Sequence, residues 1–125
     1  MANIFIVGFG GFIGSVCRYL VGGWVHRILN NAWFPFGTLV VNICGCFIIG
    51  FLGGLSESRQ VFTGETRLFL FIGVLGGFTT FSYFGYETFA LAQDGETFAA
   101  LANVALQVVL GLTAVWLGNV VSRFM

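Results

Sequence analysis

The stretch LFLFIGVLGGFTTFSYFGYETFAL, residues 68–91, decides the fold of this chain. It is long enough to cross a membrane, because about 20 apolar residues at a rise of about 1.5 Å span a hydrocarbon core of about 30 Å. Its centre, Gly76-Gly77-Phe78-Thr79-Thr80, is a poor helix former, since glycine and β-branched threonine both weaken a helix. The stretch therefore predicts a transmembrane helix that is broken in mid-membrane, where neighbouring helices must satisfy the freed backbone groups.

Three further apolar stretches have the length of membrane spans. They cover about residues 3–24, 36–55 and 98–122, and residues 57–67 form the only clearly polar loop. The 125 residues are 58% hydrophobic and 8% charged, whereas soluble proteins carry about 25% charged residues. We expect an all-α membrane protein of four transmembrane helices, with the third one broken and with residues 1–125 in a single domain.

Small residues recur at helical spacing within these spans. The pairs four residues apart are Gly10/Gly14, Gly50/Gly54 and Gly73/Gly77. Such small-xxx-small pairs let two helix backbones approach closely in a membrane. They predict packing seams between the spans.

The arginines are almost evenly divided between the two ends of the predicted bundle. With four spans, the termini and the 57–67 loop share one side of the membrane, which holds Arg59, Arg67 and Arg123. The other side holds Arg27, and Arg18 if its side chain reaches that way. This is a weak bias under the positive-inside rule. A chain so balanced can insert in both orientations, which makes an antiparallel, dual-topology homodimer available.

Enzyme and metal chemistry find little support in the residues. The sequence has no nucleophile–base pair, no carboxylate pair within a span and no phosphate loop. His26 is the single histidine, and Cys44 and Cys46 point roughly 200° apart on a helix. No zinc or copper spacing results. The net charge is zero and there is no basic tract, so we expect neither an enzyme nor a nucleic-acid partner.

Two polar residues inside the spans allow two readings each. Asn42 either joins two helices by hydrogen bonds or presents donors to a water-filled path for an anion. Arg18 lies about six residues inside the end of its span, counted from residue 24. It either reaches the interface as an anchor or supplies positive potential to an aqueous vestibule that concentrates anions.

The residues after the predicted break also have alternative interpretations. Phe81 and Phe84 are three apart and share a helix face. They contact lipid and neighbouring helices, or their positive ring edges line a path for a small anion. Glu87 is the only carboxylate well inside a span; it fits a proton relay, a cation ligand or a residue at the interface.

Three motifs in order resemble the Fluc (CrcB-type) fluoride channels over the whole chain. They are GGFIG at 10–14 followed by Arg18, GTL at 37–39 followed by Asn42, and GVLGGFTTFS at 73–82 followed by Phe84 and Glu87. The resemblance implies an antiparallel dual-topology homodimer in the inner (plasma) membrane, surrounded by lipid, with two pores at the interface. Such a channel exports fluoride passively and lowers cytoplasmic fluoride.

The resemblance also implies roles for individual residues. The implied pore residues are Thr38, Asn42, Thr80, Phe81, Ser82, Phe84, Glu87, Asn103 and Gln107, with Arg18 toward a vestibule. Backbone carbonyls of Gly76 and Thr79 would hold a structural sodium ion shared between subunits. Such oxygens are hard ligands suited to that cation. Tyr83 departs from the family pattern, which usually has threonine at that position.

Two other classes of membrane protein also fit four short spans. A small proton-coupled multidrug exporter needs a carboxylate in its first span, and this first span has only Arg18. A non-conducting membrane subunit would use its polar helix faces to dock a larger complex. It predicts no ion flux from the purified chain.

Overall fold

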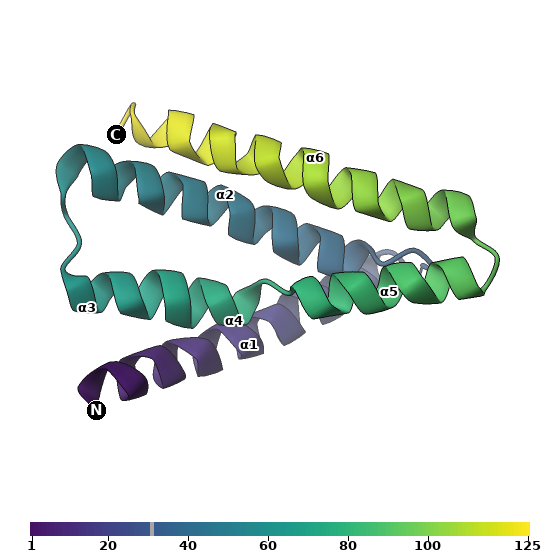
Figure 1. Cartoon of the computed structure of the whole chain (residues 1–125), viewed down its shortest axis with the longest axis horizontal. Coiled ribbons are helices and arrows are strands. Elements are labelled where there is room, and N and C mark those ends of the chain that lie inside the picture. Colours follow the sequence, from purple (N-terminus) through teal and green to yellow (C-terminus); the bar gives the residue numbers. More distant parts are fainter. Residues whose placement is uncertain (31) are drawn as a thin grey trace.

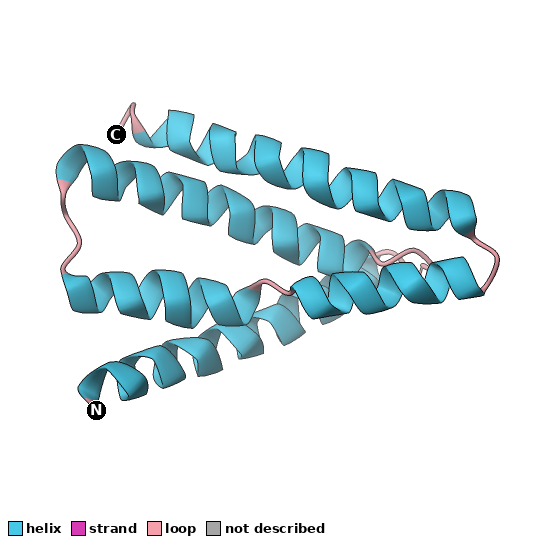
Figure 2. Cartoon of the chain, in the orientation of Figure 1, coloured by secondary structure: helices cyan, strands magenta, loops and turns pink. Residues whose placement is uncertain are grey.

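The structure, a computed structural model, is described over residues 1–30 and 32–125 and is helical there apart from turns and short connections (Figure 2). Its elements are α1 (Ala2–Ile28), α2 (Phe36–Arg59), α3 (Gly64–Arg67), η1 (Leu68–Leu75), α4 (Gly76–Phe78), α5 (Phe81–Gln93) and α6 (Thr97–Ser122). Within the described ranges, 4 helical segments are long and apolar enough to cross a membrane: α1, α2, Gly64–Gln93 and α6. The predicted all-α chain with four spans is confirmed.

The third of these segments is broken near its middle. It begins with α3, continues through η1, which has π-helical hydrogen bonding, and ends its first half at α4. Thr79 and Thr80 are extended, with φ/ψ of −82°/157° and −148°/117°. Figure 2 shows the break as a short loop between two helical halves. The predicted interruption is present but shorter than residues 76–80, because Gly76–Phe78 remain helical and only Thr79 and Thr80 separate η1 and α4 from α5.

The four spans run side by side with the termini at one end. Figure 1 places the N-terminus, the C-terminus and the α2–α3 connection at that end, and the α5–α6 connection at the other. Helices α2 and α6 pack against each other most extensively. Helix α1 packs along η1 and α4, whereas α5 packs mainly on α6 and touches α2 only lightly. The two halves of the third span therefore have different neighbours.

The polar connection between the second and third spans is shorter than the sequence predicts. Residues 57–59 are still helical, and α3 starts at Gly64, so only residues 60–63 lie between the helices. Gln60 ends α2 in the left-handed conformation, with φ of 51°. The Thr63 hydroxyl then accepts a hydrogen bond from the Thr66 N–H at 3.2 Å, which starts α3. The prediction of a loop over 57–67 was wrong at both edges.

All three glycine pairs lie in helix seams, as predicted. A methyl group at Gly10 would lie 2.7 Å from the Phe69 carbonyl oxygen, and one at Gly14 would collide with the Val74 carbonyl. These contacts seat α1 on η1. The remaining seam positions, each followed by its nearest neighbour, are Gly73 (Gly10), Gly77 (Gly11), Gly50 (Val115) and Gly54 (Ser122).

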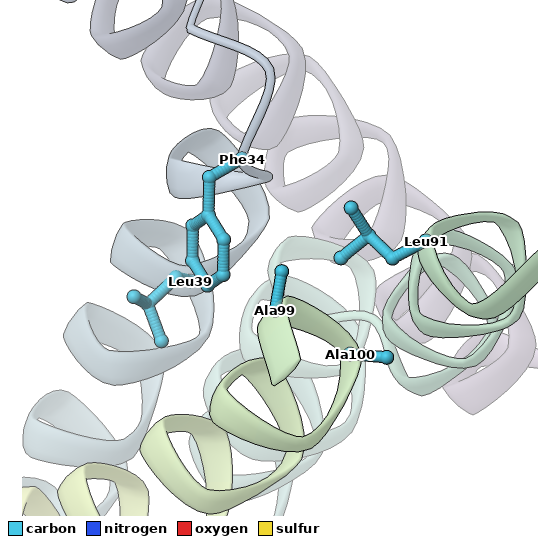
Figure 3. Packing of buried hydrophobic residues seen from close by; sticks show 5 residues of the cluster. All are labelled: Phe34, Leu39, Leu91, Ala99 and Ala100. Atoms are coloured by element: carbon cyan, nitrogen blue, oxygen red, sulfur yellow. The ribbon is translucent and has the colours of Figure 1, made fainter. Parts of the chain in front are cut away.

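Few large apolar side chains are buried within one copy of the chain. One cluster lies where the start of α2, the end of α5 and the start of α6 meet; it consists of Phe34, Leu39, Leu91, Ala99 and Ala100 (Figure 3). By contrast, Phe12, Phe98 and Trp116 are exposed, while the side chain of Asn103 is completely buried. Apolar residues outside and polar groups paired inside are the arrangement that a bilayer requires. The chain is a multi-pass membrane protein.

Candidate functional site

The break in the third span is held open by the side chain of Asn42 on α2. The Asn42 Oδ1 atom accepts a hydrogen bond from the Thr80 N–H at 2.8 Å, and its Nδ2 donates to the Thr80 carbonyl at 3.1 Å. One amide thus satisfies both backbone groups of the residue at the break, as a neighbouring strand would. In a bilayer an unpaired backbone group costs several kcal/mol. This pairing explains how an extended residue persists at membrane depth.

Local hydrogen bonds complete both ends of the break. The Leu75 carbonyl accepts from the Thr79 N–H and from the Thr79 hydroxyl, each at 3.0 Å. The Thr80 hydroxyl accepts from the Tyr83 N–H at 3.2 Å and so caps α5. The Ser82 hydroxyl lies 3.3 Å from that of Thr80. Two threonines that weaken a continuous helix therefore stabilise its two separate ends.

Asn42 also connects the break to α6. Its Nδ2 donates to Gln107 Oε1 at 3.1 Å. Gln107 Nε2 is buried, and within the described part of the chain it has no hydrogen-bond partner. A primary amide nitrogen carries two hydrogens to donate. Gln107 thus holds an unused pair of donors close to the break.

These residues border a pocket of about 410 Å³, which we call the phenylalanine pocket. The Phe81 and Phe84 rings are 5.5 Å apart between centroids and inclined by 57°. Phe81 is 83% exposed, so one copy of the chain leaves this wall of the pocket open. The pocket is lined by Asn42, Gly45, Cys46, Ile49, Phe71, Leu75, Gly76, Thr79, Thr80, Phe81, Phe84, Gln107 and Val108. No residue in this lining is formally charged.

A second pocket, of about 570 Å³, adjoins the first at Thr80. We call it the arginine pocket. Arg18 Nη1 lies 3.5 Å from the Thr79 carbonyl oxygen. The lining is Ser15, Arg18, Tyr19, Gly22, Gly23, His26, Ala32, Trp33, Phe34, Pro35, Gly37, Thr38, Val41, Thr80, Tyr83 and Glu87. Thr80 therefore belongs to the lining of both a pocket with charged groups and a neutral one.

Two further hydrogen bonds tie α5 to its neighbours. The Thr38 hydroxyl donates to Glu87 Oε1 at 2.7 Å, while Glu87 Oε2 is buried without a partner among the described residues. Asn103 Nδ2 donates to the Thr88 hydroxyl at 2.9 Å. Asn103 lines neither pocket. Glu87 therefore faces the arginine pocket, whereas Asn103 sits in the seam between α5 and α6.

The structure brings most of the residues expected at the site into one region. Ten of them border the two pockets: Arg18, Thr38, Asn42, Gly76, Thr79, Thr80, Phe81, Phe84, Glu87 and Gln107. Ser82 and Asn103 do not line either pocket, although Ser82 lies beside Thr80. Sequence reasoning missed Cys46, which lines the phenylalanine pocket one turn after Asn42, and Thr88, the partner of Asn103. Helical spacing from Asn42 was a signal for Cys46, and spacing from Phe84 was one for Thr88.

The carbonyl groups at the break have the chemistry of a site for a hard cation. The Thr80 N–H, which would bond the Gly76 carbonyl in a continuous helix, is taken by Asn42. The Gly76 oxygen has therefore lost its usual donor, and among the described residues the Thr79 oxygen has only the long contact with Arg18. The described residues contain no cluster of three or more His, Cys, Asp or Glu side chains that could hold a metal. Neutral carbonyl oxygens fit sodium better than a transition metal.

Comparison with known proteins places this geometry in a family. The sequence profile of the family described as CrcB-like protein, Camphor Resistance (CrcB), matches residues 5–119. The chain is 44% identical to Fluoride-specific ion channel FluC 3 of Methanosarcina barkeri, over 98% of this chain and 91% of that protein. It is 43% identical to Fluoride-specific ion channel FluC of Geotalea daltonii, over 99% of each chain. For Fluoride-specific ion channel FluC of Rhizobium meliloti the identity is 45%, over 100% of this chain and 99% of the relative. The chain belongs to the CrcB-like family.

Proposed function

We propose that this chain is a fluoride-selective channel that lets fluoride leave the cell passively across the plasma membrane. One observation carries the proposal. The break braced by Asn42 places two phenyl rings and Gln107, whose Nε2 has no partner among the described residues, along an uncharged pocket at membrane depth. The names of relatives that match nearly the whole chain support the same ion.

The lining of the phenylalanine pocket suits a small, strongly hydrated anion. Conduction requires partners good enough to replace water and weak enough to release the ion. The Gln107 amide offers hydrogen-bond donors, and the edges of the Phe81 and Phe84 rings carry partial positive charge. Each group is neutral, so none traps the ion as a fixed cation would. Dehydration is thus compensated stepwise along the pocket.

Arg18 is assigned to the entrance. Its guanidinium borders the arginine pocket, which reaches the phenylalanine pocket at Thr80. A positive group in a recess with low-dielectric walls raises the local concentration of anions. An anion would pass from Arg18 to Thr80 and then along the rings. The proposed activity is transport without chemistry.

The pore is proposed to be completed by a second, antiparallel copy of the chain. Phe81 is 83% exposed in one copy, so the phenylalanine pocket lacks a wall there. The near-even distribution of arginines permits insertion in both orientations. The exposed Val61, in the connection between α2 and α3, is a site for a test by Val61→Cys on a cysteine-free background. An impermeant thiol reagent should label half the sites from each side; labelling from one side only would overturn dual topology.

The carbonyl oxygens of Gly76 and Thr79 are proposed to hold a structural sodium ion, together with the same atoms of the second copy. When bound, the ion would supply fixed positive potential beside the path without blocking it. The Gly76 carbonyl is free for this role because Asn42 has taken its usual helical donor. Replacing all sodium by N-methylglucamine should lower the melting temperature of the dimer. An unchanged melting temperature and unchanged flux would contradict the sodium site.

A direct test of the function uses the purified chain alone in liposomes loaded with potassium fluoride or potassium chloride. Valinomycin lets potassium follow the anion, so release reports anion permeability. We expect rapid release of fluoride and retention of chloride. Release of neither anion would favour a non-conducting subunit. A proton-coupled exporter would instead require an acidic residue in α1, which has none.

A further inference from the structure

Helix α5 is the part of the third span whose orientation the first half cannot set. The extended residues Thr79 and Thr80 interrupt the helical hydrogen bonding between α4 and α5. Asn42 fixes the first turn of α5 through Thr80. Rotation and tilt of the helix beyond that point need a second attachment.

The rigid neighbour available for this attachment is the α2–α6 pair. These helices pack together more extensively than any other two. Their backbones are in contact at Gly50, beside the Val115 carbonyl, and at Gly118, beside the Phe47 carbonyl. Helix α5 packs on the α6 side of this pair. A bond between α6 and α5 would therefore fix α5, which carries Phe84, relative to the well-packed α2–α6 pair.

Such a bond exists and has a defined direction. Asn103 Nδ2 on α6 donates to the Thr88 hydroxyl at 2.9 Å, and that hydroxyl donates its only hydrogen to the Phe84 carbonyl at 2.7 Å. Asn103 is 0% exposed and Thr88 is half-buried, so the donor of this bond is shielded from lipid. Hydrogen bonds between side chains of neighbouring helices help to hold those helices together in a membrane.

We propose that Asn103 and Thr88 are positioning residues for fluoride conduction: they fix α5 so that Phe84 and Glu87 face the two pockets. Neither residue lines the phenylalanine pocket or the arginine pocket, so neither borders the proposed path. Thr88 is one turn from Phe84 and adjacent to Glu87, whose carboxylate is already bonded to Thr38. This inference rests on the proposed function and assigns Asn103 a place outside the pore.

The test compares Thr88→Val, which keeps the shape and removes the hydroxyl, with Thr88→Ser, which keeps the hydroxyl. Thr113→Val is a matched control, because the Thr113 hydroxyl also bonds the carbonyl four residues earlier but is exposed and lines neither pocket. We expect Thr88→Val to slow fluoride efflux about twofold to tenfold, the range that the loss of one hydrogen bond spans. Thr88→Ser should restore most of the rate, and Thr113→Val should conduct like the parent.

A spectroscopic readout separates positioning from general destabilisation. With 4-fluorophenylalanine at position 84, Thr88→Val should move the ¹⁹F resonance of the ring and Thr113→Val should not. If Thr88→Val does not fold, Asn103→Gln keeps the amide and displaces it by one methylene; it should slow efflux in folded protein. Parent-like efflux from folded Thr88→Val or Asn103→Gln would overturn the inference, as would failure of Thr88→Ser to restore the rate. A parent chain that releases no fluoride would overturn the proposed function and this inference with it.

Discussion

The two halves of the third span are held in place by opposite means. The first half, η1 and α4, lies against α1 through glycines, with Gly10 and Gly14 directly on backbone atoms of η1. The second half, α5, is held by side-chain hydrogen bonds from Thr38, Asn42 and Asn103. Close backbone packing gives a seam without polar side chains. Side-chain hydrogen bonds require polar groups inside the membrane. An ion can bind to those polar atoms that remain unpaired.

The glycine-packed half of the third span therefore contributes mainly to stability, and the hydrogen-bonded half contributes mainly to conduction. The glycine seam provides dispersion contacts that do not depend on a donor being free. On the other side of the break, Glu87 Oε2, Asn103 Oδ1 and Gln107 Nε2 are buried without partners among the described residues. Buried, unpaired polar atoms are costly, and in a folded protein they mark places where function outweighs stability. Variants in the two halves should therefore fail in different ways.

The largest expected effect is on the glycine side. Gly14→Ala would place a methyl group against the Val74 carbonyl and force α1 away from η1. We expect a loss of about 3 kcal/mol in stability, since overpacking a tight seam costs about 1–3 kcal/mol or more. Gly8→Ala is the control, because a methyl group there meets nothing within 4 Å. The measurements are thermal unfolding and efflux per folded protein. Efflux per folded protein should stay near the parent value, and a stable, non-conducting Gly14→Ala protein would break the comparison.

The next effect is on the hydrogen-bonded side. Asn42→Asp removes the donors to Thr80 and Gln107 and adds negative charge beside the path. We expect fluoride efflux to fall about hundredfold, because a charge at membrane depth costs about 2.5–3.5 kcal/mol. Asn119→Asp makes the same change next to Arg123, whose Nη2 lies 3.3 Å from Asn119 Oδ1. That control should conduct normally. Efflux is measured with a fluoride electrode. Equal efflux from both variants would show that Asn42 does not border the conduction path.

A smaller effect is expected at Thr38. Thr38→Val removes the hydroxyl that donates to Glu87 and frees the carboxylate to turn within the arginine pocket. We expect efflux to fall about fivefold, as for the loss of one ordinary hydrogen bond of about 1 kcal/mol. Thr38→Ser retains the donor and should conduct close to the parent rate. If valine and serine variants conduct alike, the Thr38–Glu87 bond has no part in conduction.

The sequence predicted the architecture because its signals are local. Span length, the glycine pairs and the weak helix at residues 76–80 all follow from neighbouring residues. The connection between α2 and α3 was predicted over residues 57–67 but covers only 60–63. The left-handed Gln60 and the Thr63 cap determine where these helices end and begin. Composition showed only that these residues are polar.

The partners within the site could not be predicted in the same way. Asn42 was selected as a buried amide, but its bond to Thr80 joins residues far apart in the chain. The same holds for Asn103, which was expected in the pore together with Gln107. The packing of α5 on α6 turns Asn103 toward Thr88 and leaves Gln107 at the pocket. Which member of a polar face reaches a pocket depends on tertiary packing.

The central claim is that the second half of the third span conducts fluoride through neutral groups, including the phenyl rings. Fluoride efflux from liposomes containing Phe84→Ile, beside Phe89→Ile, tests it most directly. Both changes keep apolar bulk and remove a ring, but Phe89 is 61% exposed and lines neither pocket. Efflux is normalised to the amount of folded protein measured by gel filtration. Phe84→Ile should then conduct about tenfold more slowly than the parent, since the change removes ring edges that supply partial positive charge. Phe89→Ile should match the parent. Parent-like efflux from folded Phe84→Ile would contradict the account and make the ring a packing residue.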